Sequence, residues 1–200
     1  QYEKQGTMKK IIITSGYYNP LHIGHVSLLK EAKALGDFLV VIVNNDAQAK
    51  IKKSVQFMAE QERLEIVKSI RSVDEVFLSI DTGLSISESL KAVAQKYAGN
   101  ELFFAKGGDR NYGNIPEAET QVCQEFQIKI VNNVGGGKVQ SSSWLIENVV
   151  NAFFQIKKIT QDNMKKFSSI QVLGNKIDMV QIPDVLELME FWITQENQKN

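Results

Sequence analysis

Two histidines lie three residues apart near the start of the chain, directly after a glycine turn. They are His22 and His25, the only two histidines in the sequence, in the stretch G-Y-Y-N-P-L-H-I-G-H that begins at Gly16. A β-branched run at 11–14 precedes the stretch, and apolar residues at helical spacing follow it. The motif is therefore predicted on a strand-to-helix turn. Free backbone N–H groups and the helix dipole favour an anion there, and we expect phosphate.

The spacing of the histidines lets both rings reach one bound group, because residues three apart at a helix start share a face. Fixed N–H donors on a phosphate would stabilise the charge that spreads onto its oxygens when phosphorus is attacked. Gly24 is expected to leave room for a triphosphate, Gly16 to allow a turn closed to most residues, and Asn19 to hold the loop. A helix cap with a core histidine is one alternative. Zinc is another, but the chain offers few further nitrogen or sulfur ligands.

The composition indicates one main domain that acts on small molecules. Apolar residues make up 43% of the chain, enough for one core. Basic and acidic residues number 23 each, so the net positive field of a non-specific nucleic-acid binder is lacking and no nucleic-acid partner is expected. A single cysteine, no long apolar run and no signal-peptide pattern predict a cytoplasmic protein without a membrane partner. Residues 1–7 are polar and are interpreted as a leader.

Apolar runs alternate with helical patterns over residues 8–151, which predicts a doubly wound, Rossmann-like parallel α/β sheet. Strands are expected at 11–14, 38–43, 76–80, 102–105 and 128–131, and helices after His22, around 64–70, at 86–97, at 116–126 and from Ser143. Ligands bind beyond the carboxyl ends of such strands, where the first strand delivers the histidine turn. Residues 152–200 differ in composition and are predicted to form a short helical extension.

A second candidate segment follows the expected strand at 102–105. It comprises Lys106, Gly107, Gly108, Asp109 and Arg110. The glycines would allow a ligand to approach the backbone, Asp109 would accept hydrogen bonds from ribose or base, and Arg110 would meet phosphate. Ordinary loop chemistry is the alternative.

Hydroxyl groups and lysines complete the candidate set. Ser141, Ser142 and Ser143 stand at an expected helix start, just after Lys138, and would bind phosphate or merely cap the helix. A lysine cluster, Lys50, Lys52 and Lys53, follows the second expected strand, and Lys50 is the first choice in it for a triphosphate. A solvated loop is the alternative for that cluster.

The glycine turn followed by H-x-G-H resembles the cytidylyltransferase-like nucleotidyltransferases. Residues 106–109 are similar to the K-G-G-D of heptose-phosphate adenylyltransferases and to the G-D of glycerol-phosphate cytidylyltransferases. The resemblance covers roughly residues 9–151 and implies that the serines contact nucleotide phosphates. The resemblance also places Gly16, Tyr17, Tyr18, Asn19 and Gly24 among the nucleotide-binding residues. Arg63 resembles a ligand-side or dimer-side arginine of the family; by spacing alone, Glu60 and Arg63 would form a surface ion pair.

Two departures from family patterns bear on the acceptor. Glycerol-phosphate cytidylyltransferases carry R-T-E-G-I-S-T, whereas glycines and Lys138 stand in place of its arginine and acid here. The arginine that follows the serines in pantetheine and nicotinamide adenylyltransferases is also lacking. Class I aminoacyl-tRNA synthetases share H-I-G-H, but this chain is too short and has no recognisable K-M-S-K-S.

The resemblance implies transfer of CMP from CTP to a phosphate or phosphonate acceptor, with release of pyrophosphate. His22 and His25 would bind the α-phosphate, Lys50 and the serines the outer phosphates, and Asp109 with its glycines the nucleoside. Mg²⁺ would be carried mainly by the triphosphate, with no resident metal site. An ATP-dependent adenylyltransferase of sugar or cofactor phosphates is the first alternative, and a non-catalytic nucleotide-binding module the second. A homodimer is expected.

Overall fold

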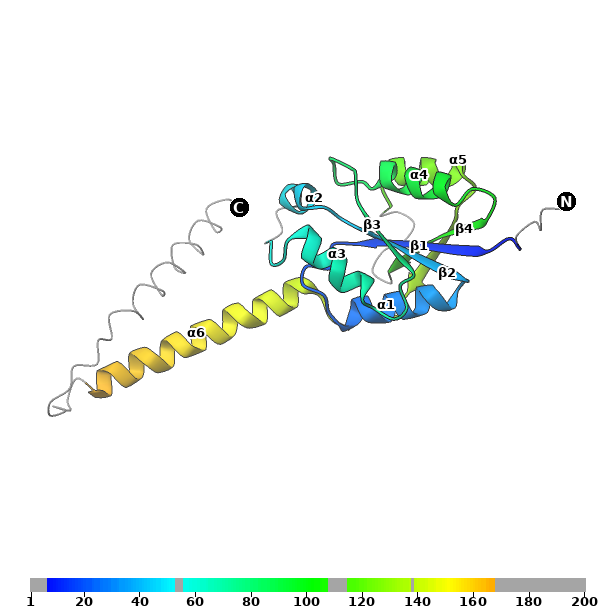
Figure 1. Cartoon of the computed structure of the whole chain (residues 1–200). Coiled ribbons are helices and arrows are strands. Elements are labelled where there is room, and N and C mark those ends of the chain that lie inside the picture. Colours follow the sequence, from blue (N-terminus) through cyan, green and yellow to red (C-terminus); the bar gives the residue numbers. More distant parts are fainter. Residues whose placement is uncertain (1–6, 53–55, 108–114, 138, 168–200) are drawn as a thin grey trace, which may run out of the picture. The chain divides into compact units, whose positions relative to one another are not determined.

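The computed structural model describes residues 7–52, 56–107, 115–137 and 139–167. The chain divides into two units, residues 1–145 and 146–200. In the first unit, five parallel strands form one sheet (Figure 1). The strands are β1 (Lys10–Gly16), β2 (Phe38–Val43), β3 (Glu75–Leu78), β4 (Glu101–Gly107) and β5 (Lys129–Val134).

The strand order is β3-β2-β1-β4-β5, which confirms the predicted doubly wound sheet. Gly16 at the end of β1 pairs with Val43 at the end of β2, and on its other side β1 pairs with β4. The direction of winding reverses between β1 and β4, so the ligand crevice of such a sheet lies beyond Gly16 and Gly107.

Helices cover both faces of the sheet, as Figure 1 shows. The helices on the two faces are α1 (Ile23–Ala34), α3 (Glu60–Lys68), α4 (Ser87–Lys96) and α5 (Glu117–Glu125). The described residues also form α2 (Asp46–Ile51) and α6 (Ser142–Phe167). Alternate β1 side chains enter two cores: Ile12 packs with residues of α1 and α3, whereas Ile11 and Ile13 pack with residues of α4 and α5. Because both faces are buried, the strands read as continuous apolar runs. Cys123, the single cysteine of the chain, is buried in α5 and packs in the core.

The short helix α2 was not predicted. Its sequence, D-A-Q-A-K-I, lacks an apolar stripe, and the residues that it buries are Gln48 and Ala49. The helix is held instead by polar groups. The Asn45 side chain accepts from the Gln48 N–H, and the Gln48 amide donates to the carbonyls of Gly83 and Ser85. These bonds fix α2 at the carboxyl end of β2.

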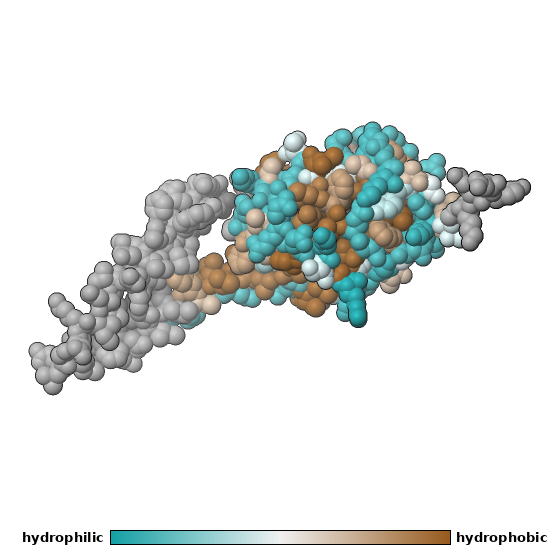
Figure 2. Space-filling view, viewed as in Figure 1, coloured by the Kyte–Doolittle hydropathy of each residue, from teal (hydrophilic) through white to brown (hydrophobic). Residues whose placement is uncertain are grey.

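Helix α6 begins close to the predicted residue and continues without a break through residue 151. The division into residues 8–151 and 152–200 remains a prediction. None of the described helices is both long and apolar enough to cross a membrane. Figure 2 shows apolar residues at the surface along α6 as well as on the α/β unit.

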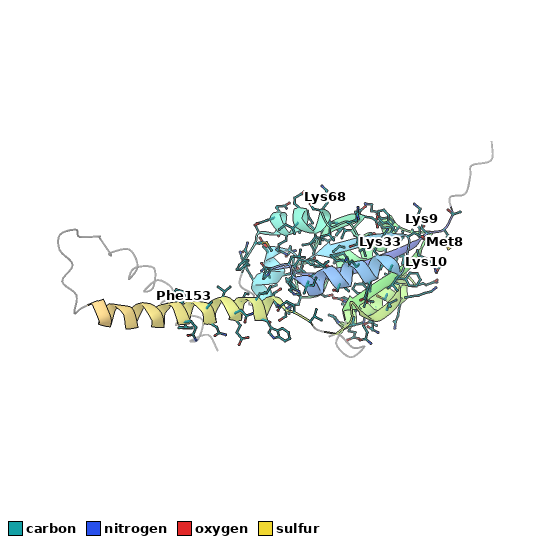
Figure 3. All side chains as sticks on the ribbon, turned by 90° about the horizontal axis from the view of Figure 1, so that it is seen from below. Met8, Lys9, Lys10, Lys33, Lys68 and Phe153 are labelled. Atoms are coloured by element: carbon teal, nitrogen blue, oxygen red, sulfur yellow. The ribbon has the colours of Figure 1, made fainter. Side chains whose placement is uncertain are left out.

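Basic residues also gather at the end of the sheet away from the histidine turn. Figure 3 shows Lys9, Lys10 and Lys33 near the amino-terminal end of β1. Lys33 pairs with Asp74 at 2.6 Å. Since the carboxyl end of β1 carries the histidines, these lysines do not belong to the candidate phosphate site.

Candidate active site

The two histidines stack on each other at the start of α1. His22 is the N-cap residue of the helix and His25 lies within its first turn. Their ring centroids are 3.7 Å apart with an interplanar angle of 25°. The pair follows β1 at the switch point of the sheet, which confirms the predicted strand-to-helix turn. Because the two rings stack, both lie beside the same point of the ligand crevice.

Both histidines favour the neutral form. Burial lowers the pKa of His22, and burial together with the charge of the neighbouring His22 ring lowers the pKa of His25 to about 3. The His22 backbone N–H donates to Nδ1 of His25 at 3.3 Å. Because a neutral imidazole has one donor and one acceptor nitrogen, this bond leaves the proton of His25 on Nε2. At neutral pH the His25 ring is therefore an uncharged N–H donor.

Burial of the histidines predicts a loss of stability in acid. The unfolded chain takes up protons below about pH 6.5, while folded His25 stays neutral down to a pH near its pKa of about 3. The free energy of unfolding should fall by about 1.4 kcal/mol per pH unit for His25 across that window. Denaturant titrations of wild type and His25→Gln measure this slope, and the variant should show a shallower one. Equal slopes would contradict neutral burial.

The glycines of the motif serve close packing. Gly16 lies within β1 and is not among the described residues with positive φ, so the expected glycine-only turn there is wrong. A Cβ at Gly16 would lie 3.0 Å from the Tyr18 ring. A Cβ at Gly24 would lie 3.1 Å from the His22 ring and 3.3 Å from the Gln140 carbonyl. The protein's own atoms therefore favour glycine here, whether or not a triphosphate is bound.

Tyr18 and Asn19 are buried residues that hold the histidine turn in place. Tyr18 is 1% exposed, and its ring centroid lies 4.8 Å from that of His25. The structure therefore places the Tyr18 side chain in the core and not on a ligand-facing surface. Asn19 is buried and accepts the N–H groups of Phe57 and Met58, both at 3.0 Å. This confirms the predicted role of Asn19 in holding the loop.

Lys52 is the lysine that approaches the histidine turn. Its Nζ lies 4.6 Å from the centroid of the Tyr17 ring, a cation–π distance. Both lysines are exposed, but Lys50 lies two residues earlier, about 200° around the axis of α2 from the position of Lys52. The sequence pattern favours Lys50 over Lys52, because a lysine cluster does not reveal which of its members lies over the Tyr17 ring. Lys53 lies outside the described residues.

Arg63 is buried, which corrects both expectations for it. Its side chain has no exposed surface, so it is neither a surface partner of Glu60 nor a ligand-side group. The guanidinium donates to the Tyr17 carbonyl at 2.7 Å and to the Asn44 carbonyl at 2.6 Å, and it pairs with Asp46. Glu60 instead accepts the Asp46 backbone N–H at 2.8 Å.

Lys106 also points inward. It is 3% exposed, and its Nζ lies 2.7 Å from the Glu119 carboxylate, as a buried ion pair between β4 and α5. Glu119 in addition accepts the Ile86 N–H at the start of α4. Gly107 ends β4 at the predicted crevice. The remaining members of this predicted segment, Gly108, Asp109 and Arg110, lie outside the described residues.

The serine segment reaches the histidine turn. The Ser142 hydroxyl donates to the Pro20 carbonyl at 2.9 Å. The Ser141 hydroxyl accepts the Trp144 N–H and lies 3.0 Å from the Ser143 hydroxyl, so Ser141 acts as a cap of α6. The structure thus brings the serines at the start of α6 beside the loop that leads to the histidines at the start of α1. Lys138 lies outside the described residues.

The described residues hold no group of three or more His, Cys, Asp or Glu side chains that could bind a metal. The side chains near the histidine turn are instead imidazoles, hydroxyls and a lysine, beside a helix N-terminus. These groups suit the oxygens of a phosphate chain. Any Mg²⁺ at this place would depend mostly on substrate oxygens, which is common for this ion.

The sequence also matches a known protein family. The model of the cytidylyltransferase-like family matches residues 13–175. The chain belongs to this family of nucleotidyltransferases. The resemblance inferred from the histidine motif is thereby confirmed.

Several relatives resemble this family member over most of its length. A FAD synthase of Thermococcus sibiricus is 37% identical over 149 residues, covering 72% of this chain and 96% of that protein. The bifunctional protein HldE of Citrifermentans bemidjiense is 30% identical over 148 residues, 72% of this chain but 28% of that protein. The chain therefore spans little more than a quarter of the HldE proteins that it matches. A solved lipopolysaccharide core biosynthesis protein of Thermoplasma volcanium is similar with a TM-score of 0.51 and 26% identity, over 62% of this chain and 96% of that one.

Proposed function

We propose that the protein transfers a nucleotidyl group from a nucleoside triphosphate to a phosphorylated acceptor. The observation that carries this proposal is the stacked, neutral histidine pair at the start of α1, beyond the carboxyl end of β1. An acceptor phosphate oxygen attacks the α-phosphorus in line. The bond from this phosphorus to the oxygen that bridges to the β-phosphorus breaks, and pyrophosphate leaves with the electron pair. Negative charge grows on the α-phosphate oxygens, and N–H donors fixed beside them stabilise it.

The surrounding residues have separate roles in this proposal. His22 and His25 bind the α-phosphate as uncharged donors. Lys52, in place of Lys50, neutralises the outer phosphates from beside Tyr17. Ser142 and its neighbours provide hydroxyl groups and backbone N–H groups at the start of α6. Mg²⁺ travels with the triphosphate and neutralises part of its charge.

The nucleotide donor in this proposal is either ATP or CTP. Transfer of CMP from CTP is the expectation drawn from the histidine motif. The similarity to a FAD synthase favours ATP, because FAD contains an adenylate, and the K-G-G-D pattern at residues 106–109 points the same way. We therefore propose ATP as the first donor to test and CTP as the second.

Thermal unfolding with ATP, CTP, GTP or UTP, each with Mg²⁺, tests the base. A ligand at a hundred times its dissociation constant stabilises the folded state by about 2.7 kcal/mol, which shifts the melting temperature by several degrees. We expect a shift with ATP and a smaller one or none with CTP. A shift with CTP alone would restore the cytidylyltransferase assignment. No shift with any triphosphate would contradict nucleotide binding at this site.

A further inference from the structure

Arg63 connects three segments that surround the candidate site. It lies on α3 and is 1% exposed. Besides its bonds to Tyr17, Asn44 and Asp46, its Nε donates to the Met58 carbonyl at 3.2 Å. One guanidinium therefore bonds to the loop after β1, the loop after β2 and the segment before α3.

Two of these segments carry the groups assigned to phosphate binding. Tyr17 immediately precedes the histidine loop, and its ring contacts Lys52. Asp46 is the first residue of α2, the helix that ends just before Lys52, and its carboxylate pairs with Arg63 at 2.7 Å. Arg63 thus bonds to the backbone carbonyl of Tyr17 before the histidine loop and to the side-chain carboxylate of Asp46 at the start of α2.

We propose that Arg63 is a positioning residue that sets the separation between the histidine pair and Lys52. A triphosphate chain spans both places, so its affinity depends on that separation. A nucleoside monophosphate reaches only the histidines, so its affinity does not. This inference rests on the proposed function, because it assumes that histidines and lysine bind one triphosphate.

Arginine is required at this position by geometry. The planar guanidinium offers five N–H donors in a fixed fork, and here its three nitrogens serve three carbonyls and one carboxylate. A lysine ammonium can keep the charge pair with Asp46 but cannot make all of these bonds from one point. Arg63→Lys therefore preserves the charge and removes the connection between the segments.

The test compares triphosphate and monophosphate affinities by calorimetry, with ATP and AMP and with CTP and CMP. In Arg63→Lys, the Kd of the triphosphate that wild type binds should rise about tenfold or more, whereas the Kd of its monophosphate should change by less than about threefold. Val67→Ala is the matched control. Val67 is fully buried one turn further along α3. Its truncation therefore weakens the same helix without removing any of the Arg63 hydrogen bonds.

The control separates positioning from general loosening. If Val67→Ala, at an equal loss of melting temperature, raises the triphosphate Kd as much as Arg63→Lys does, the inference is wrong. It is also wrong if Arg63→Lys weakens both nucleotides equally or neither. A wild type that binds no triphosphate would instead contradict the proposed function, so the two failures are distinguishable.

A double-mutant cycle with Lys52→Ala tests whether Arg63 acts through the lysine. If it does, adding Arg63→Lys to Lys52→Ala should change the triphosphate Kd by less than about twofold, because the lysine is already lost. Multiplying fold-changes would show that the two residues act independently and would overturn the proposed route.

Discussion

Replacing His22 with alanine is expected to lower kcat about a hundred- to a thousandfold, with little change in the KM for nucleotide. The reason is that a neutral donor gains most of its hydrogen-bond strength when charge develops on the α-phosphate. Steady-state kinetics of pyrophosphate release measure the effect. The fold should remain, because the change removes at most one N-cap contact of α1, which is worth about 1 kcal/mol.

Ile23→Ala is the control for this prediction. Ile23 lies between His22 and Gly24 and is 60% exposed, so its truncation alters the same turn without removing a donor. It should leave kcat within about threefold of wild type. Near-normal turnover in His22→Ala would contradict the role of the pair in charge stabilisation.

Replacing Lys52 with alanine is expected to lower kcat/KM for the triphosphate at least tenfold, whereas Lys50→Ala should change it by less than about threefold. The two lysines carry the same charge on the same segment, but only Lys52 lies over the Tyr17 ring in the described structure. Comparing the two variants therefore separates a specific contact from a general basic field. The assignment would be wrong if Lys50→Ala caused the larger loss.

The sequence was sufficient to predict the sheet and the histidine turn because both depend on local patterns. Continuous apolar runs mark strands buried on both faces, and His22 and His25 lie three residues apart at a helix start. The direction of winding follows from the alternation of strands with helices. These features need no knowledge of which distant residues meet.

The corrected residues depend on distant contacts. Glu60 and Arg63 have the spacing of a surface pair, but Arg63 is buried because Tyr17 and Asn44 offer carbonyls that lie far from it in sequence. Lys106 belongs to a segment predicted to bind nucleotide, but it pairs with Glu119 on α5, which is 13 residues further along the chain. The choice between Lys50 and Lys52 required helix α2, which has no apolar periodicity to predict it.

A charged residue beside a ligand motif can thus belong to the scaffold. Arg63 and Lys106 both lie in segments that resemble family motifs, and both bond to protein groups. Burial and the count of available partners separate such residues from ligands. Sequence spacing does not contain that information.

Formation of a nucleotide-linked product would show directly whether the protein transfers a nucleotidyl group with the help of His22. Wild type and His22→Ala are incubated with Mg²⁺, ATP or CTP, and phosphorylated sugars, alcohols and cofactors, and both pyrophosphate and linked nucleotide are measured. Wild type should form both in equal amounts with at least one acceptor, and His22→Ala should form them at least about a hundredfold more slowly. Equal rates in the two proteins, or pyrophosphate without a linked product, would contradict it.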